Sequence, residues 1–411
     1  MNKINLGIIK EGKVPVDHRV PFTPQQAANI DQTYPNVSVW CQKSDIRCFE
    51  DKEYQEAGIQ VVEDMSHCDI LFGVKEVPIR ELIAGKTYLF FSHTIKAQSY
   101  NRELLREILK KNITLIDYEV LTDTTARRLV AFGRYAGIVG AYNGILTFGR
   151  RFGLFNLKKA SDAFDLRELT TEYSKAALPP IKIALTGSGR VAGGAMEVLN
   201  GMGIKQVTPQ EFLEQTFNEP VYAQLKSLDY NRRKDGQERE KGDFYLSPEA
   251  YTSDFGKYAR VADMLIASAY WDPAAPRLFT EEDTTNPDFA IKVIADITCD
   301  IEGSIPTTKK ATTVADPVYD YDPSTREIKP AYSGKEHISV MAIDNLPCEL
   351  PRDASEDFGK DLQLHILPHL LGSDEDSIIE RATIAKDGHL TSRYAYLEAY
   401  VSGGSGDAVP V

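Results

Sequence analysis

Short apolar runs alternate with helical patterns through the first 120 residues. The run INLGIIK (4–10) precedes the amphipathic TPQQAANI (23–30), and VSVWC (37–41) precedes EYQEAGI (53–59). Apolar positions recur with the period of a strand in the first kind of segment and with that of a helix in the second. The alternation continues with strand patterns at 69–76, 87–93 and 112–119 and a helical pattern at 101–111. Such repetition predicts a parallel α/β sheet.

The stretch at 131–153, AFGRYAGIVGAYNGILTFGRRFG, has a different character. Small residues are mixed with apolar ones at helical spacing, which predicts a buried helix packed closely against a neighbour. We expect this helix to connect two domains, because 411 residues exceed what one hydrophobic core usually serves.

A second α/β unit is expected after residue 180. The strand pattern IKIALT (181–186) leads into a glycine turn, a helix and a second strand, KQVTP (205–209). Buried-strand patterns return at 262–271 and 290–300. The charged, tyrosine-rich segment 219–260 is interpreted as an insertion or solvent-facing excursion and not as core.

From Ile338 a turn feeds a long amphipathic helix, which we expect to return to the first domain. The predicted organisation is therefore an N-terminal domain begun by 1–145, a second domain at 146–340, a return segment at 341–400 and a flexible tail at 401–411.

Composition and charge exclude several classes of protein. The net charge of -13 argues against a nucleic-acid or anionic-membrane surface, because the field would repel phosphate. No apolar run reaches the ~18 residues of a membrane span, and MNKINLGIIKEGK does not resemble a secretory signal. The cysteines lack metal-ligand spacing, so we expect reduced thiols, no metal and a cytoplasmic protein, either monomer or homodimer. They are Cys41, Cys48, Cys68, Cys299 and Cys348.

Gly187, Gly189 and Ala192 satisfy G-x-G-x-x-G/A directly after a strand and at the start of a helix. The first glycine allows the tight turn, the second lets the backbone approach a pyrophosphate, and the helix N-terminus favours the anion. The alternative is an ordinary strand-to-helix turn. The context favours a dinucleotide.

The second strand of this unit ends without the acid that normally holds the ribose 2′-hydroxyl of NAD. Thr208, Pro209 and Gln210 follow the strand, Glu211 comes one step late, and Arg190 lies in the glycine loop. A missing acid removes repulsion against a 2′-phosphate, so NADP(H) is favoured and NAD(H) remains possible.

Polar side chains follow at least four strand patterns of the first domain. Any one of them alone is more simply a solvated rim residue or a structural donor. Because ligands of parallel sheets bind beyond the carboxyl ends of the strands, the set together predicts a substrate site. Clustered cations and burial lower the pKa of a lysine, which could then act as a base near pH 7, and arginines suit carboxylates. The set is Arg19, Lys75, His93, Lys96, Gln98, Glu119 and Arg128.

Several motifs resemble the saccharopine dehydrogenase and lysine-ketoglutarate reductase branch of the alanine dehydrogenase and transhydrogenase superfamily. They are HRVPFTP (18–24), GVKEVP (73–78), FFSHTIKAQ (90–98), ASAYWDPAAPRLFT (267–280) and DNLPCELPRDAS (344–355). The resemblance covers nearly all of 1–400. It implies two Rossmann-like, doubly wound α/β domains with a cleft between them that holds cofactor and substrate.

The resemblance also implies a reaction, the reversible, nicotinamide-linked formation of saccharopine from lysine and 2-oxoglutarate through an imine. Lys75 matches the family's base and His93 its acid/base histidine. Substrate-side positions fall on Arg19, Lys96, Gln98, Glu119, Arg128 and Phe132. Cofactor-side positions fall on Arg127, Gly187, Ser188, Gly189, Arg190, Val191, Ala267, Ser268, Ala269, Tyr270, Asp296, Ile297, Asp300 and Asp344.

Two other hypotheses remain open. An alanine dehydrogenase-like enzyme shares the lysine and histidine but usually carries a different turn where this chain has DNLPCELP. A nucleotide-binding regulatory protein without turnover would have little use for both Lys75 and His93.

Overall fold

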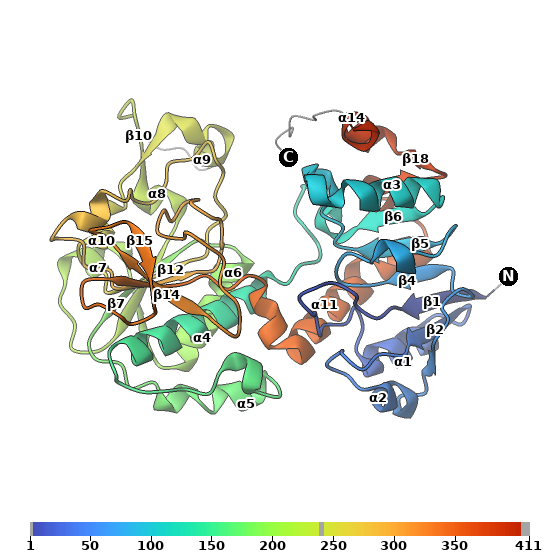
Figure 1. Ribbon diagram of the computed structural model, residues 1–411, viewed down its shortest axis with the longest axis horizontal. Coiled ribbons are helices and arrows are strands. Elements are labelled where there is room, and N and C mark those ends of the chain that lie inside the picture. The colour runs from blue at the N-terminus through green and yellow to red at the C-terminus, as the bar shows by residue number, and fades with distance from the viewer. Residues whose placement is uncertain (1–2, 238–241, 404–411) are drawn as a thin grey trace. The chain divides into compact units, whose positions relative to one another are not determined.

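The structure is a computed structural model that describes residues 3–237 and 242–403. The chain forms two compact units, one from residues 3–132 together with 351–403 and the other from residues 133–350. The first unit thus combines the two ends of the described chain, drawn in blue to cyan and in red (Figure 1). The predicted return of the C-terminal segment corresponds to this arrangement.

The first unit is built on an eight-stranded sheet in which β3, β2, β1, β4, β5 and β6 are parallel neighbours in that order. This is the doubly wound order, and antiparallel β17 and β18 extend it beyond β6. The strands are β1 (Ile4–Ile8), β2 (Val37–Gln42), β3 (Gln60–Val62), β4 (Ile70–Phe72), β5 (Thr87–Phe90), β6 (Thr114–Asp117), β17 (Thr383–Lys386) and β18 (His389–Leu390).

The helices of the first unit cover this sheet. Apolar faces drive the packing, as in α3, where Leu104, Leu105 and Ile108 are buried at helical spacing. The helices are α1 (Pro24–Thr33), α2 (Asp51–Glu56), α3 (Arg102–Lys110), α11 (Pro351–His365), α12 (Leu367–Leu371), α13 (Ile378–Ala382) and α14 (Glu398–Ser402).

The beginning of the expected flexible tail is ordered, so that part of the prediction is wrong. Val401 and Ser402 belong to α14. The Arg106 side chain donates a hydrogen bond to the carbonyl of Val401, and neighbouring Tyr400 is buried, so these contacts hold the last helical turn on the unit. The remainder of the predicted tail, 404–411, lies outside the described residues.

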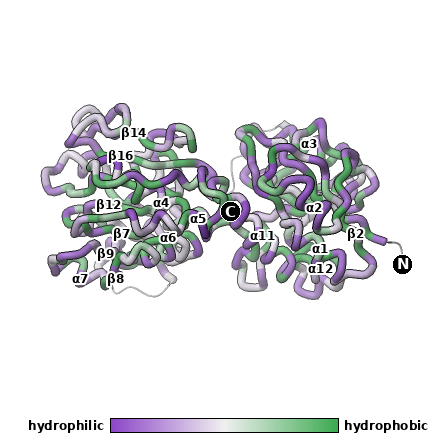
Figure 2. Tube along the Cα trace, turned by 90° about the horizontal axis from the view of Figure 1, so that it is seen from below, coloured by the Kyte–Doolittle hydropathy of each residue, from purple (hydrophilic) through white to green (hydrophobic). Residues whose placement is uncertain are grey.

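The second unit has its own eight-stranded sheet, in the order β8, β9, β7, β12, β13, β16, β14 and β15. The first six strands are parallel, while β14 pairs antiparallel with both β16 and β15. Figure 2 shows apolar residues along its central strands. The strands are β7 (Lys182–Thr186), β8 (Lys205–Val207), β9 (Val221–Leu225), β12 (Met264–Ala267), β13 (Val293–Asp296), β14 (Val318–Asp322), β15 (Glu327–Lys329) and β16 (Ile338–Met341).

Beside this sheet, β10 (Asn231–Arg233) and β11 (Tyr251–Ser253) form a two-stranded ribbon. Helix α4 corresponds to the connecting helix predicted at 131–153, and it belongs wholly to the second unit. The helices are α4 (Gly133–Arg151), α5 (Leu166–Thr170), α6 (Arg190–Gly201), α7 (Pro209–Glu214), α8 (Ser227–Tyr230), α9 (Asp243–Leu246) and α10 (Gly256–Ala259).

The interpretation of 219–260 as a solvent-facing excursion is wrong for its first part. Strand β9 lies between β7 and β8, and Val221, Tyr222, Ala223 and Leu225 are all buried. An inner parallel strand is covered on both faces and therefore reads as a short apolar run without alternation. The charged residues on either side obscured this run. Strand β8, next in sequence after β7, is the edge strand and does not neighbour β7.

Helices α4 and α6 pack through glycines. A Cβ added at Gly137 would lie 1.9 Å from the carbonyl oxygen of Val191, and one at Gly194 would lie 1.9 Å from that of Arg134. Each helix thus brings its backbone against the backbone of the other. The small residues of the 131–153 pattern make this close approach possible, as the sequence indicated.

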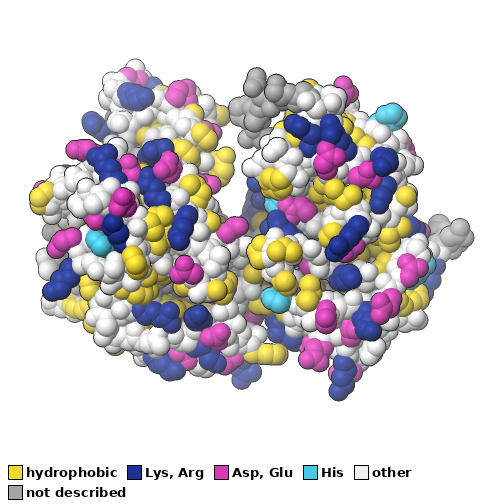
Figure 3. Space-filling view, viewed as in Figure 1, with side chains coloured by type: hydrophobic (Ala, Val, Ile, Leu, Met, Phe, Trp, Pro, Cys, Tyr) yellow, Lys and Arg dark blue, Asp and Glu magenta, His cyan; other side chains and the backbone are white. Residues whose placement is uncertain are grey.

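Surface charge is mixed over the visible face, where blue cationic and magenta anionic side chains are interspersed (Figure 3). Within the described ranges, none of the helices combines the length and apolar content of a membrane span. All five cysteines are free thiols.

Candidate active site

Neighbouring strand ends of the first unit gather polar groups, as predicted from the sequence. Strands β1, β4, β5 and β6 are consecutive and parallel, so their carboxyl ends meet at one edge of the sheet. Lys75 follows β4 and His93 follows β5. Glu119 follows β6, where it lies in a short 3-10 turn.

Lys75 is held by its backbone and surrounded by charge. The Glu11 carboxylate accepts hydrogen bonds from the backbone N–H groups of Val74 (2.7 Å) and Lys75 (2.8 Å). Burial, followed by repulsion from Arg19 and Lys13, lowers the pKa of Lys75. Its amine is thus brought closer to the neutral form that a proton acceptor requires.

His93 is oriented by a carboxylate that the sequence analysis missed. The Glu76 side chain contacts His93 Nδ1 at 2.7 Å and accepts a bond from Lys13 Nζ at 2.8 Å. Burial alone would raise the pKa of Glu76, but the bonds from His93 and Lys13 outweigh it and lower the pKa to about 2. Glu76 therefore carries a negative charge that fixes one ring nitrogen. Its position directly after Lys75 gave no signal that distinguishes it from an ordinary surface glutamate.

The backbone at His93 has the left-handed conformation, with φ of 53°. Non-glycine residues rarely adopt it, and they do so where the surroundings impose a particular side-chain direction. Ser92, which directly precedes the histidine, donates two hydrogen bonds to Asp117 at the end of β6, one from its backbone N–H (3.0 Å) and one from its hydroxyl. These bonds tie the ends of β5 and β6 together.

A second carboxylate collects two more of the predicted residues. Glu119 lies 3.2 Å from Lys96 Nζ and 3.4 Å from an Nη of Arg128. Both cationic side chains are partly exposed, at 48% and 40%. Exposed ion pairs of this kind contribute little to stability.

Arg19 occupies a more enclosed position than the sequence indicated. Its guanidinium pairs with Asp17 through contacts of 3.0 and 2.6 Å and lies over the Phe132 ring at 4.1 Å. Phe132 in turn stacks on Phe358 of α11. Arg19 therefore holds Phe132 and adds positive charge near Lys75.

Two predicted residues of this unit lie away from these contacts. Gln98 precedes a short 3-10 turn, and its carbonyl accepts a bond from Tyr400. Arg127 is exposed in the turn that closes between Thr122 and Arg128, and its backbone N–H donates to Asp123.

The glycine loop of the second unit has the geometry that a dinucleotide requires. Gly187 has φ of 108°, and a Cβ there would meet Ser268 Oγ at 2.9 Å. Gly189 precedes α6, and a Cβ there would meet nothing within 4 Å, so open space lies above its backbone. A pyrophosphate could therefore approach the loop closely.

A cavity of about 590 Å³ adjoins this loop. Its lining includes five of the predicted cofactor residues: Val191, Ser268, Tyr270, Ile297 and Asp300. Thr298 also lies in the wall, within the stretch Asp296 to Asp300 that the resemblance assigned to the nicotinamide side. The sequence analysis missed Ala136, Trp271, Pro273 and Ile301, which complete the wall.

The other predicted cofactor residues support the cavity or lie apart from it. Asp296 is fully buried, where its side chain accepts bonds from the hydroxyls of Thr298 and Thr308. Burial raises the pKa of Asp296. Ala267 ends β12, Ala269 lies against Gly187, and Ser188 is exposed in the loop. Asp344 is exposed, and its N–H donates to the Thr312 carbonyl.

Comparison with known proteins bears on both units. Residues 7–139 match the family model described as alanine dehydrogenase/PNT, N-terminal domain. The chain carries an alanine dehydrogenase/PNT N-terminal domain. This confirms the superfamily indicated by the motifs.

Curated relatives extend the likeness of this chain beyond that domain. Mouse alpha-aminoadipic semialdehyde synthase, mitochondrial, is 32% identical over 93% of the chain, and the Arabidopsis thaliana synthase is 29% identical over 95%. The chain spans only 46% and 41% of these two relatives. Saccharopine dehydrogenase [NAD(+), L-lysine-forming] of Neurospora crassa is 28% identical, covering 87% of this chain and 88% of the relative.

Solved structures confirm the fold of the chain. An L-alanine dehydrogenase has a TM-score of 0.66 at 15% identity and covers 97% of this chain and 99% of its own. A transhydrogenase from Sinorhizobium meliloti has a TM-score of 0.61 at 14% identity and covers 94% and 100%. The predicted α/β class with Rossmann-like sheets is thereby confirmed.

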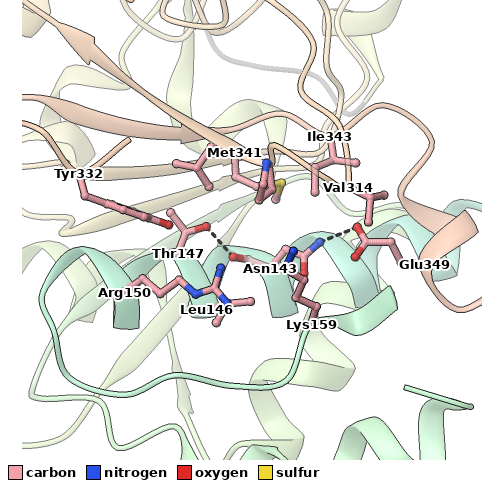
Figure 4. A pocket seen from close by; sticks show the side chains of 12 residues that line it. Asn143, Leu146, Thr147, Arg150, Lys159, Val314, Tyr332, Met341, Ile343 and Glu349 are labelled. Carbon is pink, nitrogen blue, oxygen red and sulfur yellow. Dashed lines mark hydrogen bonds between the residues drawn. The ribbon is translucent and has the colours of Figure 1, made fainter. Parts of the chain in front are cut away.

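A smaller cavity lies between α4 and the strands β14 and β16 (Figure 4). Its room of about 20 Å³ suffices for one water, so it is not a substrate site. Asn143 donates a hydrogen bond of 2.8 Å to Glu349 in its wall. Burial raises the pKa of Glu349 to about 7.

Proposed function

We propose that this chain is a saccharopine-type oxidoreductase that condenses lysine with 2-oxoglutarate, reversibly and with NADP(H). The observation that carries the proposal is the pair of proton-handling groups at adjacent strand ends. Lys75 has a lowered pKa, and His93 is fixed by Glu76. The names of the curated relatives support saccharopine chemistry at 25–32% identity.

The chemistry divides naturally between these two groups. In the direction of saccharopine oxidation, a hydride leaves C2 of the glutarate moiety and the secondary amine loses a proton, which gives an imine. Lys75 accepts that proton. His93 then helps water add to the imine carbon and helps the resulting carbinolamine expel the lysine amine, which leaves the 2-oxo acid. A bound nicotinamide supplies the hydride acceptor.

Substrate carboxylates require cations near these groups. Lys96 and Arg128 are suited to this because their partner Glu119 leaves both partly exposed. We assign Gln98 and Phe132 to the substrate side as well. Arg19 acts mainly through its field, which helps keep the Lys75 amine neutral.

The second unit would hold the dinucleotide. We assign the pyrophosphate to the loop Gly187, Ser188, Gly189, Arg190 and Val191, and the nicotinamide half to the adjoining cavity. Arg127 and Asp344 complete the assigned cofactor positions. Free thiols are compatible with the reducing cytoplasm, which we propose as the compartment.

Two mixtures test the reaction. Purified protein is incubated with NADPH, lysine and 2-oxoglutarate, and separately with NADH, pyruvate and ammonium, while nicotinamide absorbance is followed. We expect NADPH consumption in the first mixture, with saccharopine identified by mass spectrometry. Consumption in the second mixture alone would identify an alanine dehydrogenase. Tight nucleotide binding without consumption in either would identify a binding protein.

A further inference from the structure

The strand order of the second unit changes where the adenosine end of the cofactor must be recognised. In dinucleotide-binding sheets the ribose 2′ position is read at the carboxyl end of the strand beside the first strand, which is normally the next strand in sequence. Here the first strand is β7, and its neighbour on that side is β9. The end of β8, which the sequence analysis used, is one strand further away.

The end of β9 carries a cation. Lys226 follows Leu225 directly, at the position where an NAD-specific sheet would present its acid, and the Lys226 side chain is exposed. A surface cavity of about 490 Å³ opens here, and Lys226, Gln224 and Thr208 contribute to its wall. The cavity thus lies at the ends of both β9 and β8.

A direct contact joins this cavity to the pyrophosphate loop. Gln224 Nε2 donates a hydrogen bond of 3.0 Å to the carbonyl of Gly187. The side chain that holds the glycine turn therefore also lines the cavity. A dinucleotide whose pyrophosphate lies on the loop would place its adenosine half here.

Two carboxylates also border the cavity, and both already serve local contacts. Glu211 accepts bonds of 2.8 Å from the backbone N–H and the hydroxyl of Thr208. Asp229 accepts one of 2.7 Å from the backbone N–H of Lys226. These contacts fix the two chain segments, and the exposed side chain of Lys226 lines the same cavity.

We propose that Lys226 binds the 2′-phosphate of NADP(H) and sets the preference of this chain over NAD(H). The ammonium makes charge-assisted hydrogen bonds to the phosphate oxygens, with Thr208 beside it. This inference rests on the proposed function only for the presence of a nicotinamide dinucleotide. It assigns a specificity residue to the end of β9, whereas the spacing of the motif points to the end of β8.

Binding measurements without substrate test the assignment on the full chain. Calorimetry would compare 2′,5′-ADP with 5′-AMP, and fluorescence would compare NADPH with NADH. Because a hydrogen bond to a charged group is involved, we expect Lys226→Ala to weaken 2′,5′-ADP and NADPH about 10- to 100-fold. Binding of 5′-AMP and NADH should stay within about twofold. Lys226→Arg should retain the preference.

Control variants separate this role from general electrostatics. Lys205→Ala removes a lysine of edge strand β8 that pairs with Glu219, and it should leave the ratio of the two affinities unchanged. An unchanged ratio in Lys226→Ala would overturn the proposal. So would a selective loss of NADH affinity in Asp229→Asn, because Asp229 would then be reading the ribose hydroxyls.

The outcomes also distinguish this inference from the reaction assigned above. Saccharopine formation with an unchanged nucleotide ratio in Lys226→Ala would refute the role of Lys226 and leave the reaction standing. A 2′-phosphate preference that depends on Lys226, without turnover of lysine and 2-oxoglutarate, would refute the reaction alone.

Discussion

The packing of α4 on α6 yields a sharp prediction, because adjacent glycines of α6 have opposite surroundings. Gly194 is buried against α4, and an added Cβ would lie 1.9 Å from the Arg134 carbonyl oxygen and 3.1 Å from the Ile138 nitrogen. Gly193 is exposed, and a Cβ there would meet nothing within 4 Å. Alanine at the two positions adds the same group to the same helix.

The magnitudes follow from the contacts. Gly193→Ala gains helix propensity and should stabilise the protein by about 1 kcal/mol. In Gly194→Ala the same gain opposes a collision with backbone, which cannot rotate away as a side chain can. Overpacking typically costs about 1–3 kcal/mol, and separating two backbones belongs at the upper end, so we expect net destabilisation of about 1–2 kcal/mol.

Thermal unfolding measures the difference. At about 2–4 °C per kcal/mol for a unit of this size, the two variants should differ by about 4–12 °C in Tm, with Gly193→Ala above wild type and Gly194→Ala below it. NADPH titration gives a second readout. Because α6 begins at the pyrophosphate loop, its displacement in Gly194→Ala should weaken NADPH several-fold, whereas Gly193→Ala should bind normally. Equal or higher stability of Gly194→Ala would refute the reasoning.

Three further predictions concern charge and protons. Lys75→Met should lower turnover by orders of magnitude with NADPH affinity near normal, so an active variant in a steady-state assay would remove this amine from the mechanism. Lys13→Gln removes a cation that lowers the pKa of Lys75, so the acidic limb of the saccharopine-oxidation pH profile should move to higher pH; an unmoved limb would contradict this coupling. The pKa of Glu349 rises from 4.5 to about 7 on folding, because burial favours its protonated form. The contribution of Glu349 to the stability of the folded protein is therefore fully present below pH 4.5 and is lost as pH rises through 7. Glu349→Gln should therefore reduce the loss of unfolding free energy between pH 5 and 8 by up to about 3 kcal/mol, and urea titrations with equal losses in both proteins would contradict it.

The sequence predicted strands β1, β2, β4, β5 and β6 of the first sheet because they are separated by clear helical patterns and several end in unusual polar residues. The short strands β3, β17 and β18 were not predicted, and the last two make the sheet mixed and not wholly parallel. Lys75 and His93 could be found because each follows an apolar strand closely and carries a side chain that can exchange protons. Glu76 was missed because a glutamate beside a lysine reads as ordinary surface charge. Only the three-dimensional pairing with His93 distinguishes it.

The second sheet was harder to predict for two physical reasons. Strand β9 is a five-residue strand with four apolar side chains, flanked in sequence by charged residues, and its insertion between β7 and β8 leaves no local trace in the sequence. Strand β14, VYDYD, carries Asp320, a buried acid that accepts hydrogen bonds from Ser333 and Ser339 and lies 3.6 Å from Arg151 of α4. In the sequence alone, a segment that contains such an acid looks like an exposed loop, because the partners of the acid lie far away along the chain.

The position of β9 leads to an expectation about the order in which the second sheet assembles. Strand β8 is hydrogen-bonded to β9 and not to β7, so β7, α6 and β8 cannot close as a local strand–helix–strand unit. We therefore expect residues 205–207 to dock after residues 221–225, because the pairing of β7 with β9 closes a longer stretch of chain than a β7–β8 pair would. Substitutions at Ala223 should therefore slow refolding in stopped-flow experiments, whereas those at Gln206 should mainly accelerate unfolding.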